Sequence, residues 1–229
     1  MRLDRYLSQV TELSRSQARS AIRAGRVLVE GVAVNQPSRQ VESQTAVVLD
    51  DLALRPPLPR YYMLNKPLGV VCATRDPSHR TVLDLLDTVG FGSLHIAGRL
   101  DIDASGLVLI TDDGQWSHRI TAPVRDCGKT YRVGLAEPLS EADAERLRQG
   151  VELRHESKPT RPAELQMLGE SRLRLTITEG KYHQVKRMLA AVGNRVVSLH
   201  RESIGGLTLD EGLAEGEYRL LSQEEVALF

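Results

Sequence analysis

The residues whose types and spacing suggest chemistry are concentrated between positions 98 and 114. Within this stretch, Asp101 and Asp103 precede four consecutive apolar residues, 107–110. If both aspartates lie on one strand, their side chains share a face, with Cβ atoms about 7 Å apart. Two carboxylates arranged in this way have the chemistry to act on a glycosidic bond. Only 4% of the chain is aromatic, however, so no aromatic platform for a sugar is evident.

The same stretch partly matches the spacing of an EF-hand calcium loop. Loop positions 1, 3, 5, 6, 8 and 12 are occupied by Asp101, Asp103, Ser105, Gly106, Val108 and Asp112. The last of these is shorter than the bidentate glutamate that the motif requires, and glycines stand where a flanking helix is needed. The two cysteines, Cys72 and Cys127, are too few for a four-ligand zinc site. The sequence therefore favours a protein without a metal.

Two helices and a hairpin are predicted near the start of the chain. Apolar residues recur at helical spacing over residues 3–10. A second helix is expected to begin at Ser14, where Gln17 completes a capping box, and to end at Gly25. Residues 27–34 are two β-branched runs around a Glu-Gly pair, which is typical of a tight β-hairpin.

Zero net charge conceals two basic segments. The chain has 30 Lys plus Arg and 30 Asp plus Glu, but residues 1–40 carry seven arginines against three acids. On the second predicted helix Arg15, Arg19 and Arg23 lie within about 80° of one another. Such a one-sign stripe is better explained by contacts to phosphate than by a solvated helix face. Residues 172–201, with seven basic residues and one acid, are predicted to form a second phosphate-binding surface.

A proline-rich segment, residues 55–60, predicts an extended linker between two domains, 1–54 and 61–229. Strand patterns outnumber helix patterns in the second domain and do not alternate regularly with them. We therefore predict an α+β fold, with a mixed, mainly antiparallel sheet and flanking helices. The segments that carry these patterns are strands at 61–66, 107–110, 172–178 and 196–199 and a helix at 185–192.

The N-terminal pattern resembles the S4-type RNA-binding module, a helix pair followed by a hairpin. The match covers about 45 residues and includes Arg2-Leu3-Asp4, Ser14-Arg15, Ala18, Ile22, Gly25-Arg26-Val27, Val29, Gly31 and Val34.

The second domain resembles the pseudouridine synthases through three motifs in the family's order. These motifs are Gly98-Arg99-Leu100-Asp101 with Ser105-Gly106-Leu107, then Cys127-Gly128-Lys129-Thr130-Tyr131, and finally residues 180–188 around Lys186. Together with the S4-like module they cover nearly the whole chain. The chain further resembles the family members that act on the small ribosomal subunit. This resemblance lies in the sequence around Asp101, at Trp116-Ser117-His118-Arg119-Ile120 and at His200-Arg201-Glu202.

This resemblance assigns roles to individual residues. It implies that Asp101 is the essential carboxylate, that Tyr131 stacks on the uracil, and that Lys186 pairs with the aspartate. His183 is expected to be structural, and Asp103 to belong to a turn that faces solvent. The residues predicted to bind RNA are Arg2, Arg5, Arg15, Arg19, Arg23, Arg26, Arg99 and Arg187.

The resemblance also implies the reaction and its partners. The expected substrate is 16S rRNA or a small-subunit assembly intermediate, with the uridine conventionally numbered 516 as the target. The reaction requires no cofactor, and a monomer would suffice. The longest stretch without a charge, residues 88–98, is far shorter than the roughly 20 residues needed to span a membrane, so a cytoplasmic protein with no membrane partner is expected. The alternative is a noncatalytic RNA-binding or ribosome-assembly factor.

Overall fold

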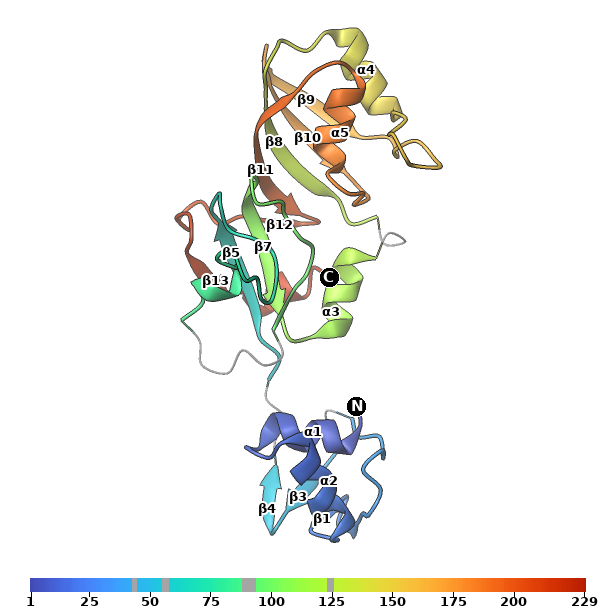
Figure 1. Ribbon diagram of the computed structural model, residues 1–229, viewed down its shortest axis with the longest axis vertical. Coiled ribbons are helices and arrows are strands. Elements are labelled where there is room, and N and C mark those ends of the chain that lie inside the picture. Colours follow the sequence, from blue (N-terminus) through green and yellow to red (C-terminus); the bar gives the residue numbers. More distant parts are fainter. Residues whose placement is uncertain (43–44, 55–57, 88–93, 123–125) are drawn as a thin grey trace. The chain divides into compact units, whose positions relative to one another are not determined.

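The computed structural model describes the chain except for residues 43–44, 55–57, 88–93 and 123–125. The chain divides into two compact units, Met1–Leu58 and Pro59–Phe229 (Figure 1). The first half of the predicted linker lies outside the described residues. Among the helices that the structure describes, none combines the length and the apolar character needed to cross a bilayer.

The N-terminal unit packs two helices on a small antiparallel sheet with strand order β2-β1-β3-β4. Ser14 caps the second helix through the predicted capping box. Glu30 and Gly31 both have positive φ, 52° and 76°, as a tight hairpin turn requires. The helices and the hairpin predicted for this unit are therefore confirmed. Its elements are α1 (Leu3–Val10), α2 (Arg15–Arg23), β1 (Val27–Val29), β2 (Val32–Ala33), β3 (Val47–Leu49) and β4 (Leu52–Leu54).

The second unit is built on one sheet with the strand order β13-β5-β7-β11-β8-β10-β9. All neighbouring pairs in this order are antiparallel except β7 and β11. The predicted α+β class is confirmed. The strands are β5 (Tyr61–Lys66), β6 (His95–Ile96), β7 (Ser105–Thr111), β8 (Lys129–Leu135), β9 (Glu164–Gly169), β10 (Arg172–Ile177), β11 (Val196–Ile204), β12 (Leu207–Thr208) and β13 (Tyr218–Leu220).

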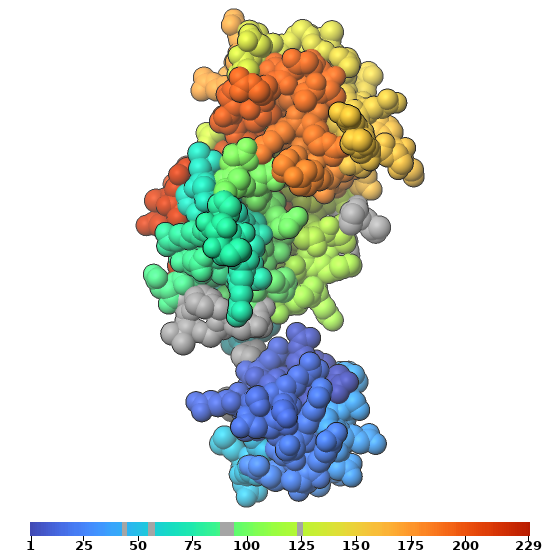
Figure 2. Space-filling model, viewed as in Figure 1, coloured from blue at the N-terminus to red at the C-terminus, as the bar shows by residue number. Residues whose placement is uncertain are grey.

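Helices cover both faces of this sheet, which explains the continuous apolar run in β7. On one face Val108 and Ile110 join the main core, and on the other Leu107 and Leu109 pack with Trp116. Figure 1 shows α4 and α5 beside strands β8, β10 and β9, and α3 beside β7. In Figure 2 the orange surface around α5 adjoins the gold surface of the segment that follows α4. The helices are α3 (Gly114–Thr121), α4 (Glu141–Gln149), α5 (Gln184–Ala191) and α6 (Gln223–Val226), with a 3-10 turn at Leu83–Leu85.

Candidate active site

A cavity of about 610 Å³ lies in the second unit, where the loop before β7 meets β8 and the start of α5. Asp101, Tyr131 and Lys186 all line it, although up to 85 positions separate them in the sequence. The cavity has the volume of an ordinary small-ligand site. The fold therefore gathers the three residues that were predicted to be catalytic around one space.

The loop that carries Asp101 is held from below by Arg201 on β11. This arginine is 2% exposed and donates hydrogen bonds to the backbone oxygens of Leu107 (2.8 Å), Gly98 (3.1 Å) and Arg99 (3.4 Å). Gly106 permits the close approach of β11, because a Cβ at this position would lie 2.3 Å from the Arg201 carbonyl oxygen. Arg201 was not among the predicted site residues, because its place in a basic segment concealed its burial.

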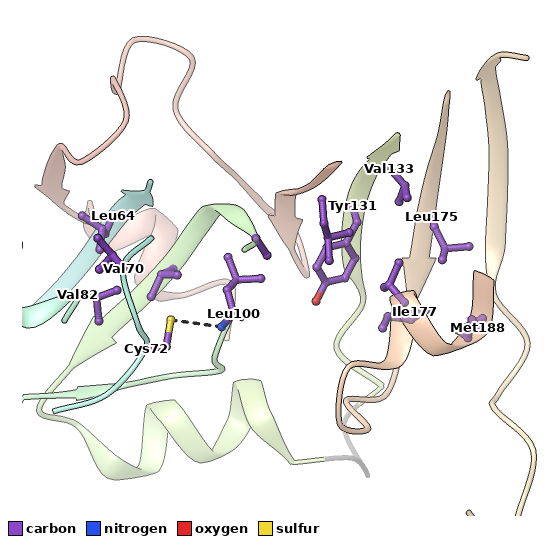
Figure 3. Close-up of a cluster of buried hydrophobic side chains, with 14 of the residues drawn as sticks. Leu64, Val70, Cys72, Val82, Leu100, Tyr131, Val133, Leu175, Ile177 and Met188 are labelled. Atoms are coloured by element: carbon purple, nitrogen blue, oxygen red, sulfur yellow. Dashed lines mark hydrogen bonds between the residues drawn. The ribbon is translucent and has the colours of Figure 1, made fainter. Parts of the chain in front are cut away.

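A second buried cation supports the other end of the same loop. Lys66, at the end of β5, is fully buried and donates to the carbonyl oxygens of Ala104 (2.7 Å) and Pro67 (2.9 Å). Burial lowers the pKa of Lys66. In addition, the Leu100 amide donates to the Cys72 sulfur (3.3 Å), as the dashed line in Figure 3 shows. Three side chains thus fix the backbone around Asp101.

Lys186 on α5 binds both aspartates of the loop. Its Nζ lies 3.0 Å from Asp101 Oδ2 and 2.5 Å from Asp103 Oδ1. Burial alone would lower the pKa of Lys186, but the hydrogen bonds to Asp103 and Asp101 raise it. The hydrogen bond from Lys186 also lowers the pKa of Asp103. Asp103 lies in an exposed turn, as expected, and its carboxylate in addition shares the lysine with Asp101.

The calcium interpretation of this segment is wrong. Its second half is the buried strand β7, so Val108 lies in a sheet rather than in a metal-binding loop. Throughout the described part of the chain, no cluster of three or more His, Cys, Asp or Glu side chains could hold a metal ion.

Tyr131 lies on β8, is 8% exposed, and borders both the cavity and the hydrophobic core. In Figure 3 its ring lies between the Leu64–Val82 side of the core and the Val133–Met188 side. Its hydroxyl forms no hydrogen bond to another described residue, so it remains available to a molecule in the cavity. Lys129, two positions earlier on β8, also lines the cavity, and burial lowers its pKa. Strand alternation was the signal that could have identified Lys129.

Two more side chains complete the rim. Arg99 is exposed, lines the cavity, and forms no ion pair with any residue that the structure describes. His183 has a left-handed backbone (φ 47°, ψ 38°) and its Nε2 lies 3.5 Å from Asp101 Oδ1. Lys186 and His183 therefore approach different oxygens of the same carboxylate, so His183 belongs to the site as well as to the start of α5.

The predicted arginine stripe in the N-terminal unit is organised around Asp4. This carboxylate is completely buried and lies 3.0 Å from Arg2, 2.9 Å from Arg19 and 3.7 Å from Arg15. The hydrogen bond from Arg2 lowers the pKa of Asp4, burial opposes the shift, and Arg19 adds to the lowering. The sequence signal that could have indicated this cluster is the position of Asp4 on the apolar face of α1. One acid for three arginines leaves a net positive surface.

The remaining predicted RNA-binding arginines differ in their surroundings. Arg5 and Arg23 are exposed and have no ion-pair partner in the described ranges, whereas Arg26 pairs with Asp50. Arg187 is held by Glu156 and by backbone oxygens of residues 154 and 182.

Most of the basic residues predicted to form a surface at 172–201 are paired or buried. Besides Arg187, Arg174 pairs with Glu202, Lys181 pairs with Glu156, Lys186 binds the aspartates, and Arg201 is buried. Counting charges along the chain could not reveal these partners, which lie on other elements.

Comparison with known proteins gives matches along the whole chain. Residues 60–191 match a family model described as RNA pseudouridylate synthase, and residues 1–47 match the S4 domain. The ribosomal small subunit pseudouridine synthase A of Escherichia coli K12 is 53% identical over 228 residues, covering 99% of each chain. Its counterpart in Vibrio cholerae is 49% identical over 227 residues, covering 99% of this chain and 98% of the relative. A crystal structure of a pseudouridylate synthase covers 100% of both chains at 47% identity, with a TM-score of 0.73.

Proposed function

The chain belongs to the RNA pseudouridylate synthase family and has an S4 domain at residues 1–47, and we propose that it converts a uridine of 16S rRNA to pseudouridine. Relatives 48–53% identical over 99% of this chain are named as synthases of the ribosomal small subunit. We propose the uridine conventionally numbered 516 as the target and the cytoplasm, where ribosomal subunits assemble, as the location. The substrate is 16S rRNA or a small-subunit assembly intermediate, and one copy of the chain is sufficient for the reaction.

The observation that carries the proposed mechanism is the Asp101–Lys186 pair, at 3.0 Å, in a cavity that Tyr131 also lines. Pseudouridine formation breaks the N1–C1′ bond of uridine and forms a C5–C1′ bond. The hydrogen on C5 leaves as a proton, and N1 gains a proton. Nothing is consumed, so the isomerisation needs no cofactor and no second carboxylate to activate water.

In this mechanism the Asp101 carboxylate acts on the nucleoside as its glycosidic bond breaks. Lys186 donates a hydrogen bond to this carboxylate and places a positive charge beside it. Tyr131, which lines the cavity, packs its ring against the uracil, and its hydroxyl assists removal of the C5 proton. The shared cavity and the Lys186 hydrogen bond support these roles.

The target uridine must leave its stack to enter the cavity. Arg99, exposed at the rim, is suited to fill the vacated space or to hold the opened strand. The arginines around Asp4, together with Arg5 and Arg23, would bind phosphates of the RNA without reading its sequence. The family's substrate would thus be held by charge and positioned by shape.

The test is release of tritium from [5-³H]uridine-labelled 16S rRNA, as a transcript and in small-subunit particles. We expect release by the wild type and none by Asp101→Asn, with the modified position mapped by reverse transcription after carbodiimide treatment. Asp103→Asn is the matched control, because Asp103 also binds Lys186 but its side chain is 67% exposed. An exposed pair contributes about 0–1 kcal/mol, so this variant should lose less than about tenfold in rate.

Two outcomes would contradict the proposal. Full-rate turnover by Asp101→Asn would remove the aspartate from the mechanism. Binding of the RNA without tritium release from transcript or particles would leave only a noncatalytic assembly factor.

A further inference from the structure

The loop between β10 and α5 presents an aromatic ring at the rim of the cavity. Tyr182 is 72% exposed, and among the described residues no other aromatic side chain is exposed to this degree. It lines the same cavity as Asp101. Tyr182 belongs to no hydrophobic core cluster of the described residues, so core packing does not explain its place at the rim.

One face of this ring is already stacked. The Tyr182 and His183 rings lie 3.8 Å apart between centroids, with an angle of 20° between their planes. His183 in turn approaches Asp101 Oδ1 at 3.5 Å. The inner face of Tyr182 is therefore covered by a residue of the site, and its outer face is left to solvent.

The backbone under the ring is firmly held. Arg187 donates to the carbonyl oxygen of Tyr182 at 3.0 Å, and Glu156 binds both Arg187 (2.9 Å) and Lys181 (3.2 Å). These contacts join α5 to the segment after α4, the orange and gold surfaces that meet in Figure 2. His183 supplies a left-handed residue at the turn. The tyrosine is thus positioned before any ligand arrives, which reduces the ordering cost of binding.

We propose that the outer face of Tyr182 is a stacking site for a nucleobase that neighbours the target uridine in the RNA strand. This inference rests on the proposed function and adds a subsite to it. A base fits better than a phosphate here, because the nearby cations Lys181 and Arg187 are already paired with Glu156. A base on Tyr182 would extend the stack to His183 and so hold the strand while the uridine occupies the cavity.

The expected effect follows from the usual strength of base–aromatic stacking. Loss of one such contact weakens binding by about 5- to 150-fold, equivalent to about 1–3 kcal/mol. Tyr182→Leu removes the ring, and Tyr182→Phe retains it. We expect the leucine variant to raise KM by this factor with little change in kcat, and the phenylalanine variant to behave as the wild type.

The test combines each protein with modified RNA. 16S rRNA is assembled by ligation around a synthetic segment that is abasic at the nucleotide on either side of the target uridine in turn. If the stacking partner is one of these bases, Tyr182→Leu should cost nothing further on the RNA that lacks it. An equal loss on every RNA, or no loss on unmodified RNA, would overturn the inference.

A second measurement does not depend on turnover. 2-Aminopurine is placed at each flanking position, and its fluorescence is measured on binding. Quenching by the wild type and Tyr182→Phe, but not by Tyr182→Leu, supports the stacking site. Identical fluorescence for all three proteins refutes it. Absence of tritium release by the wild type would count against the proposed function, and the fluorescence would still decide whether Tyr182 stacks on a base.

Discussion

Replacing Gly106 by alanine should damage both the fold and the site, by an amount that the structure specifies. Gly106 has φ of +103°, a conformation that costs an L-residue about 1–2 kcal/mol. Its new Cβ would lie 2.3 Å from the Arg201 carbonyl oxygen and 2.7 Å from the Arg201 nitrogen. Relief of such crowding typically costs a further 1–3 kcal/mol. We therefore expect the free energy of unfolding of the second unit to fall by about 2–5 kcal/mol.

The same substitution should also reduce activity in the protein that remains folded. An ordinary contact requires the Cβ and the Arg201 oxygen to lie at least 3.4 Å apart, about 1 Å farther than in the structure. Arg201 holds the loop of Asp101, so the displacement would reach the carboxylate. A misplacement of about 1 Å can cost on the order of 100-fold in rate.

Two other glycines of the same unit separate the two causes. Gly69→Ala introduces the positive-φ strain, at +77°, with no atom within 4 Å of the new Cβ, so it should cost about 1–2 kcal/mol. Gly114→Ala, at the start of α3, has neither strain nor contact and should be neutral or slightly stabilising. Urea unfolding measures stability, and tritium release at a temperature where all variants are folded measures activity. If Gly106→Ala is no less stable than Gly69→Ala, the close approach of β7 and β11 is not what the glycine provides.

Three further predictions concern the charged groups. Lys186→Met should slow tritium release by about 10- to 150-fold, because it removes a hydrogen bond to a charged group. Lys186→Arg should retain more activity, and a methionine variant that turns over at full rate would contradict the prediction. Because the pKa of Asp4 is lowered in the folded protein, its stabilising effect should be complete above about pH 4 and be lost as the pH falls further. Circular dichroism during acid titration should therefore show that Asp4→Asn, less stable by about 1.5–3 kcal/mol at neutral pH, lacks this acid-dependent loss. If Arg5 and Arg23 each bind a phosphate, glutamine at either position should reduce the slope of log K for RNA against log salt by about 0.7–0.9, and an unchanged slope would exclude that contact.

Local sequence signals predicted the elements that depend on near neighbours. The capping box at Ser14, the turn at Glu30 and the helical spacing that identifies α5 each act within a few residues, so their physics is visible in a short window. The motifs also indicated which residues would meet in the cavity. The catalytic roles of these residues stay predictions, whereas the 3.0 Å contact between Asp101 and Lys186 is observed in the structure.

Contacts between distant segments could not be predicted in the same way. Arg201 looked like one member of a basic segment, yet the parallel pairing of β11 with β7 buries it beneath a loop about 100 positions earlier. Asp103 lies in the predicted exposed turn, but its bond to Lys186 was not predicted because the lysine comes from another element. Asp4 illustrates the same point, since its partners Arg15 and Arg19 lie on the other helix of the N-terminal unit. In each case the partner depends on tertiary pairing.

The two buried cations beside the site contribute positive charge to it as well as hydrogen bonds to the loop. Lys66 and Arg201 bind backbone carbonyls, and neither pairs with a carboxylate in the part of the chain that the structure describes. Their positive charges are therefore not cancelled locally, and in a buried environment they are weakly screened. Burial lowers the pKa of Lys66, and the nearby charges of Asp103 and Asp101 oppose that shift. The side chains that fix the loop thus also place two positive charges beside the carboxylate on which the proposed reaction depends.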